Sequence, residues 1–179
     1  LPIFEITRDI ATRFNQRFGE TFVIPDAVTP AAGARVMDLQ NPTAKMSKSA
    51  SGDAGIVDLL DEPDAIAKKF KRAVTDSDSE VRYDVAAKPG VSGLLDILAA
   101  ATGRSPQDAA ADYTQYGPLK ADTGEAVVAL LEPIQARYRE LIADKGELAR
   151  LLSIGAGRAR TVASATLQRA YDHIGLVRP

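Results

Sequence analysis

The chain has 179 residues, 45% of them hydrophobic and 26% charged, which is enough to bury the core of one domain or of one and a half. It has no cysteine and one histidine, which excludes disulfides and thiolate metal sites and argues against a histidine-based zinc site. The net charge of −2 argues against a dedicated nucleic-acid binder, and the lack of a long apolar run or secretion signal favours a cytoplasmic protein that does not span a membrane.

The first 57 residues combine one helical pattern with two strand patterns. Apolar residues recur every four positions and predict an amphipathic helix, at Ile6, Ile10, Phe14 and Phe18. Gly19 can take the left-handed conformation that ends this helix. Residues 22–24 and 34–39 are typical of short buried strands. We therefore expect residues 1–57 to be an α/β remnant with too few strands to close a sheet core alone.

Helical patterns predominate from residue 58 onward. Pro63 occupies a preferred first helical position, and the segment 105–108, Ser-Pro-Gln-Asp, resembles a helix capping box. The longest periodic run covers residues 124–143 with Pro133 inside it, which predicts a kink rather than a break. These patterns predict a mainly α-helical bundle over residues 58–144 and further helices over residues 145–179.

Near the end of the first part lies a short polar segment with no hydrophobic period, which we call the lysine loop: Lys45-Met46-Ser47-Lys48-Ser49. The absence of a period predicts an exposed, mobile loop. Its two ammonium groups and its hydroxyls suit a polyphosphate. A solvated lysine/serine linker has the same composition. The order of the five residues favours the phosphate hypothesis, because a chance match is expected in on the order of one chain in ten thousand of this length.

Two other features could be over-interpreted. A basic cluster on the helix that follows Pro63 could contact RNA phosphates, or could be the ordinary solvated face of an amphipathic helix: Lys68, Lys69, Lys71 and Arg72. His173 precedes Ile174 and Gly175, and we interpret it as a helix-end residue followed by a glycine cap. With one histidine near the end of the chain, no Ser/His/Asp arrangement can be built with conviction.

Lys-Met-Ser-Lys-Ser is the ATP-handling signature of class I aminoacyl-tRNA synthetases, and its surroundings resemble the bacterial tryptophanyl-tRNA synthetases. The resemblance covers about residues 5–176. It is carried by the segments 5–15, 33–39, 69–77, 82–84, 88–92 and 133–138. The related tyrosyl enzymes share the broad fold but lack this downstream series. Because the fold is shared, a tyrosyl-type relative remains an alternative interpretation of this chain.

The resemblance implies a fold and a role for each of three regions of the chain. Residues 1–57 would be the C-terminal part of a Rossmann-like catalytic domain, including the lysine loop. Residues 58–144 would form the helical anticodon-binding region. Residues 145–179 would be helices that pack back on the catalytic domain. The family is dimeric, so the resemblance also implies a homodimer.

The resemblance also implies chemistry. Lys48, assisted by Lys45, would stabilise the charge that develops on pyrophosphate when the carboxylate of L-tryptophan attacks ATP. Val36 would offer backbone hydrogen bonds to the adenine. Met46, Ser47 and Ser49 would complete the loop over the triphosphate, and Mg²⁺ would share the charge. The tryptophanyl group would then pass to the tRNA for tryptophan.

The sequence departs from the family in lacking the first half of its catalytic domain. We therefore expect this chain to be inactive as an isolated fragment. A hypothesis from another class is a non-catalytic tRNA-binding or interaction module that kept the fold without the chemistry. Binding of tRNA without help from other segments would separate that module from a fragment of an enzyme.

Overall fold

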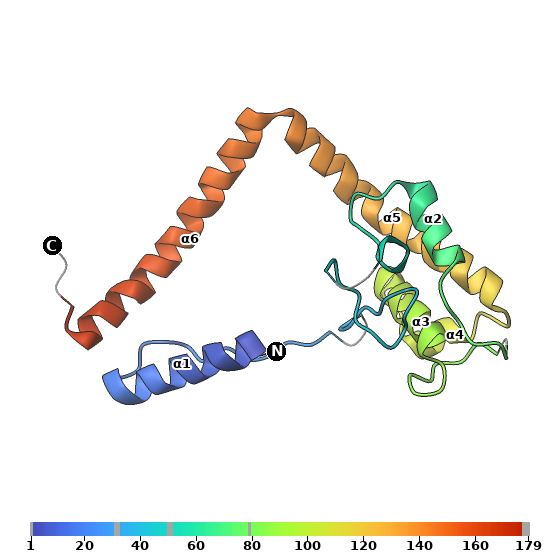
Figure 1. Ribbon diagram of the computed structural model, residues 1–179. Helices are drawn as coiled ribbons and strands as arrows, with labels where there is room; N and C mark the ends of the chain where they lie inside the picture. Colours follow the sequence, from blue (N-terminus) through green and yellow to red (C-terminus); the bar gives the residue numbers. More distant parts are fainter. Residues whose placement is uncertain (1, 31–32, 50–51, 79, 177–179) are drawn as a thin grey trace. The chain divides into compact units, whose positions relative to one another are not determined.

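The computed structural model describes residues 2–30, 33–49, 52–78 and 80–176 (Figure 1). Their regular structure is helical: α1 (Pro2–Phe18), the 3-10 turn η1 (Asp53–Gly55), α2 (Pro63–Lys71), α3 (Pro89–Thr102), α4 (Pro106–Ala110), α5 (Tyr116–Ala143) and α6 (Lys145–Ile174). The helices predicted from residue 58 onward are present. The further helices predicted over residues 145–179 form the single helix α6.

The prediction of an α/β remnant of a Rossmann-like catalytic domain is wrong for this structure. The described part of residues 1–57 contains no strand, and residues 22–24 are extended chain in which Val23 is 91% exposed. Residues 34–39 form only an isolated antiparallel bridge, between Met37 and Lys45. A strand exists only when another backbone segment satisfies its hydrogen bonds, and no such segment lies beside residues 22–24 in the described parts of the chain.

Contacts divide the chain into two compact units. The first unit joins Leu1–Val28 to Leu141–Pro179, and the second is Thr29–Glu140. The helix α5 runs from the second unit into the first. The boundaries after residues 57 and 144 were predicted for functional regions, and the roles of those regions stay predictions.

The second unit carries the main hydrophobic core. Buried side chains from α2, α3 and α5 meet in one cluster, whose members include Ile66, Phe70, Val91, Leu94, Leu95, Leu98, Leu119 and Leu131. Full burial of such a side chain contributes about 1.5–3 kcal/mol. The helix α5 packs against α2 at Gly124, where a Cβ would lie 3.4 Å from the Cβ of Phe70, an ordinary contact distance. The lysine loop lies beside this core through Met46, which packs against it.

Local signals placed several helix ends correctly. Pro63 opens α2, and the Oγ of Ser105 accepts a hydrogen bond of 3.1 Å from the backbone N–H of Asp108 at the start of α4. Gly103 ends α3 with a φ of 70°, a left-handed conformation that glycine adopts without strain. The helix α5 continues through Pro133, so the absence of a break is confirmed and the kink stays a prediction.

In the first unit, a turn after α1 is tied to both helices. The side chain of Asn15 accepts hydrogen bonds from the N–H groups of Thr21 (3.1 Å) and Phe22 (2.9 Å). The Oγ1 of Thr21 lies 2.5 Å from the Nδ1 of His173, near the end of α6. Gly175 then ends α6 with a φ of 76°. This confirms the interpretation of His173 as a helix-end residue.

None of the described helices combines the length and the apolar character needed to cross a membrane.

Candidate functional site

The lysine loop starts from a fixed base. The N–H of Met46 donates to the carbonyl of Val36 at 3.0 Å, and the N–H of Asp38 donates to the carbonyl of Ala44 at 2.9 Å. These two bonds close residues 36–46 into a narrow loop around the bridge between Met37 and Lys45. The first lysine of the loop is therefore held by the backbone, and the rest of the loop extends from it.

The chain is fixed again after the loop, at Gly55. The N–H of Leu39 donates to the carbonyl of Gly55 at 3.0 Å. A Cβ on Gly55 would lie 2.3 Å from the Oδ1 of Asp38, so only glycine permits this approach. Asp38 is itself fixed, because its Oδ1 accepts from the N–H groups of Gln40 (2.7 Å) and Asn41 (2.9 Å). Both ends of the lysine loop are thus anchored on residues 38–39.

The loop itself is polar and open to solvent. The Nζ of Lys48 lies 2.9 Å from the Oδ1 of Asp58, and the two side chains are 87% and 37% exposed. The hydroxyls of Ser47 and Ser49 lie 3.2 Å apart. An ion pair this exposed is worth little, so an incoming anion can displace Asp58 from Lys48.

The two lysines face different hollows of the second unit. Val36, Lys45 and Met46 line a hollow of about 520 Å³ together with apolar side chains of α2, α3 and α5. Lys48 lines a second hollow of about 670 Å³ with Asp58, Asp61 and two side chains of α5, Ile134 and Tyr138. The structure therefore brings together the predicted adenine residue and the first lysine, and it places the second lysine apart from them.

One wall of the second hollow is the turn Asp58–Asp61, which we call the anchor turn. The N–H of Asp58 donates to the Oδ2 of Asp61 at 3.0 Å, and the N–H of Asp61 donates to the carbonyl of Asp58 at 3.1 Å. The buried amide of Gln135 on α5 donates at 2.9 Å to the carbonyls of both Leu59 and Asp61. The turn is therefore held by its own hydrogen bonds and by the side chain of Gln135 on α5.

Lys69 holds the anchor turn from α2. Its Nζ lies 2.7 Å from the Oδ2 of Asp61 and 3.5 Å from the Oδ1 of Asp53. Burial disfavours both charged forms, but the hydrogen bond and the mutual attraction outweigh it. The pKa of Lys69 is raised and the pKa of Asp61 is lowered. Lys69 is 9% exposed, whereas the other predicted RNA contacts, Lys68, Lys71 and Arg72, are exposed.

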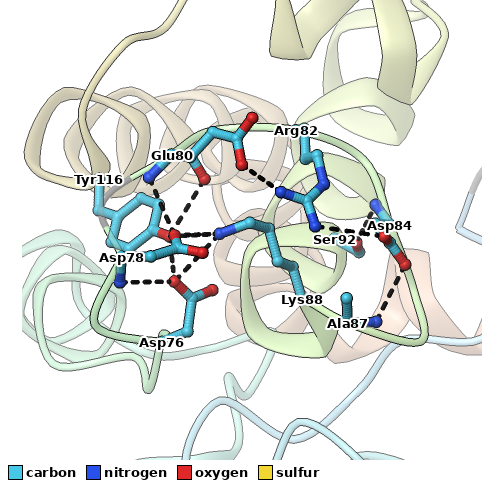
Figure 2. Close-up of polar contacts among 9 residues, drawn as sticks. All are labelled: Asp76, Asp78, Glu80, Arg82, Asp84, Ala87, Lys88, Ser92 and Tyr116. Carbon is cyan, nitrogen blue, oxygen red and sulfur yellow. Dashed lines mark hydrogen bonds and ion pairs between the residues drawn. The ribbon is translucent and has the colours of Figure 1, made fainter.

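A second polar cluster ties the segment after α2 to α3 and α5 (Figure 2). The Nζ of Lys88 lies 3.1 Å from the Oδ1 of Asp76, and it also contacts the carboxylate of Asp78. The hydroxyl of Tyr116 donates to these carboxylates and accepts from Lys88. We call these four residues the Lys88 cluster. Lys88 is 1% exposed, so the cluster is a structural tie rather than an open binding site.

Sequence reasoning missed the anchor turn and the Lys88 cluster. Asp58 and Asp61 flank a pair of leucines, and Lys88 precedes a helix-opening proline, which are weak local signals. Across the described part of the chain, no group of three or more His, Cys, Asp or Glu side chains could hold a metal ion.

Comparisons with known proteins place this chain in a family. A family model described as tRNA synthetases class I (W and Y) matches residues 2–132. The chain is 54% identical over 173 residues to tryptophan–tRNA ligase 1 of Streptomyces avermitilis, covering 97% of this chain and 52% of that protein. It is 51% identical over 175 residues to tryptophan–tRNA ligase of Mycobacterium leprae, covering 97% of this chain and 51% of that protein.

A solved structure agrees with these matches. Tryptophanyl-tRNA synthetase from Mycoplasma pneumoniae superposes with a TM-score of 0.88 at 32% identity, covering 97% of this chain and 53% of that one. The chain thus spans about half the length of the relatives that it matches.

Proposed function

We propose a function from one premise: this chain belongs to the class I tRNA synthetases (W and Y). The proposed activity is the ATP-dependent ligation of L-tryptophan to its cognate tRNA, to which this chain contributes the lysine loop and the helical region. One observation carries the proposal. The Lys-Met-Ser-Lys-Ser loop lies inside a chain about half of whose residues are identical to those of tryptophan–tRNA ligases.

The reaction needs positioned positive charge rather than a general acid or base. An oxygen of the tryptophan carboxylate attacks the α-phosphorus of ATP, the bond to the β-phosphate oxygen breaks, and pyrophosphate leaves with the added negative charge. Lys48, assisted by Lys45, would stabilise that charge. A hydroxyl at the 3′ end of the tRNA then attacks the carbonyl carbon of the adenylate, and AMP leaves.

The remaining loop residues would bind ATP. Val36 would meet the adenine through its backbone, at the hollow that it lines with Lys45 and Met46. Ser47 and Ser49 would donate hydroxyls to phosphate oxygens. Mg²⁺ would arrive with the triphosphate of ATP and share its charge.

The helical region would contact tRNA. We propose residues 58–144 as the anticodon-binding part, with the exposed cations Lys68, Lys71 and Arg72 on phosphates. Lys69 would instead hold the anchor turn, because its ammonium is engaged with Asp61. We also propose that the protein is cytoplasmic and that it forms a homodimer. A mass measurement of the native protein in solution tests the dimer.

The test is pyrophosphate exchange into ATP by the full-length gene product. Exchange should depend on tryptophan, and exchange with tyrosine alone would identify a tyrosyl-type relative. The substitution Lys48→Ala should slow adenylate formation much more than it weakens tryptophan binding, whereas equal losses would contradict the assigned role. Lys71→Ala is the matched control, since it should leave exchange unchanged.

A non-catalytic module would behave differently in two assays. It would bind tRNA in a filter assay with a strong salt dependence, and it would show no tryptophan-dependent exchange.

A further inference from the structure

The anchor turn is held by an unusually large number of polar contacts for a four-residue turn. Its backbone is closed by two internal hydrogen bonds, Gln135 holds two of its carbonyls, and the nearly buried Lys69 holds the carboxylate of Asp61. Asp61 in turn accepts from the N–H of Asp58. The backbone of Asp58 is therefore connected to both α2 and α5, and its side chain extends from a backbone position that the fold holds in place.

The side chain on the other side of this contact is much freer. Lys48 is 87% exposed and lies in the loop that extends from the base at residues 36–46, and its Nζ lies 2.9 Å from the Oδ1 of Asp58. An exposed cation is thus paired with an anion whose backbone is held by the anchor turn, at the edge of a hollow of about 670 Å³.

We propose that Asp58 is a positioning residue for Lys48. In the ATP-free protein it holds the ε-ammonium against the anchor turn, and it gives up that ammonium when the triphosphate binds. The proposal rests on the function proposed above and adds a resting position for its second lysine. Because the anchor turn is bonded to α2 and α5, this position is set by the helical region.

The strength of the contact suits a reversible restraint. A solvent-exposed ion pair contributes only enough to change an equilibrium by about 1.5- to fivefold. The triphosphate carries several negative charges, so it can compete successfully for Lys48. ATP can bind Lys48 only after the ion pair with Asp58 is broken. The pair therefore reduces the apparent affinity for ATP by the same factor, about 1.5- to fivefold.

The substitution Asp58→Asn tests this in the full-length gene product. It keeps the size of the side chain and removes the charge that attracts Lys48. We expect the KM for ATP in tryptophan-dependent pyrophosphate exchange to fall by about 1.5- to fivefold, with kcat and the KM for tryptophan unchanged. Equilibrium binding of ATP should tighten by the same factor. The gain should shrink as the salt concentration rises, because the exposed pair is screened.

Asp64→Asn is the matched control. It removes the same charge from the first turn of α2, and it should leave the KM for ATP unchanged. An Asp58→Asn variant with an unchanged or raised KM for ATP overturns the proposal, and so does an equal fall in Asp64→Asn, which would indicate a general charge effect. If the unaltered protein shows no tryptophan-dependent exchange, the proposed function fails instead. Equal melting temperatures of variant and parent confirm that folding is not the cause of any change.

Discussion

The ammonium nitrogen of Lys88 lies 3.0 Å from the hydroxyl oxygen of Tyr116, at a point where three elements meet. Lys88 is the cap of α3, Tyr116 is the first residue of α5, and both contact Asp76 and Asp78 in the segment that follows α2 (Figure 2). A cation that is 1% exposed is tolerated only where anions and polar groups replace its water. The cluster therefore fixes the start of α3 relative to α2 and α5 within the second unit.

We expect Lys88→Met to destabilise the protein strongly. The substitution keeps a long side chain but leaves the carboxylates of Asp76 and Asp78 facing each other without a cation. The melting temperature should fall by about 5 °C or more. Lys68→Met, at an exposed position on α2, is the control and should change the melting temperature little. Equal melting temperatures for the two variants would contradict the structural role of the Lys88 cluster.

The same cluster predicts how stability depends on pH. The hydrogen bond from Lys88, helped by the N–H of Glu80 and by Tyr116, holds the pKa of Asp78 below its ordinary value of 3.8. A lowered pKa contributes stability that is fully present above pH 3.8 and is lost as the pH falls further. Melting temperatures measured through this range should decline on the acid side. Asp78→Asn should reduce the slope of that decline, and an unchanged slope would argue against the tie to Lys88.

Tyr116 predicts a change on the alkaline side. Burial, followed by the carboxylate of Asp76, raises the pKa of Tyr116 to about 12 from 10.0. The unfolded chain releases this proton first, so stability should decrease as the pH rises above 10.0. In a tyrosinate absorbance titration, one late-ionising group should disappear in Tyr116→Phe. If the absorbance change at the alkaline end of the titration is the same in Tyr116→Phe as in the parent, the Tyr116 hydroxyl does not have the contacts that the structure shows.

The features that sequence predicted correctly depend on neighbouring residues. Pro63, Ser105 and Gly175 mark helix ends through their own backbone preferences, and all three lie where those preferences placed them. The lysine loop was identified by the order of its residues and not by any geometry.

The features that sequence missed depend on distant partners. The strand expected at residues 34–39 required another strand beside it, and an apolar pattern cannot supply one. Gln135 lies 76 positions from Leu59, and no local pattern joins them. Lys69 was predicted as a possible RNA contact because its neighbours are basic, yet its place on α2 directs it to Asp61.

Gln135→Leu tests the anchor turn. The buried amide donates to the carbonyls of Leu59 and Asp61, and leucine would leave both without this donor. We expect a loss of about 1–3 kcal/mol in the free energy of unfolding, measured by urea denaturation. Gln107→Leu, at an exposed position of α4, should cost far less. A loss at Gln135 no larger than at Gln107 would show that the turn is held without α5.

Two glycines of α3 should respond in opposite ways to alanine. A Cβ on Gly90 would lie 2.2 Å from the carbonyl oxygen of Val74, whose own N–H is bonded to Leu39 at 2.7 Å and resists movement. Gly90→Ala should therefore cost about 1–3 kcal/mol in the free energy of unfolding. A Cβ on Gly93 would lie 3.8 Å from the Cβ of Met37, an ordinary contact.

Gly93→Ala should instead gain up to about 1 kcal/mol, because alanine favours the helix and restricts the unfolded chain. The two variants carry the same added methyl group three positions apart in one helix. Urea denaturation of both variants compares the close backbone approach at Val74 with an ordinary contact at Met37. Equal effects would mean that α3 does not approach residue 74 as closely as the structure places it.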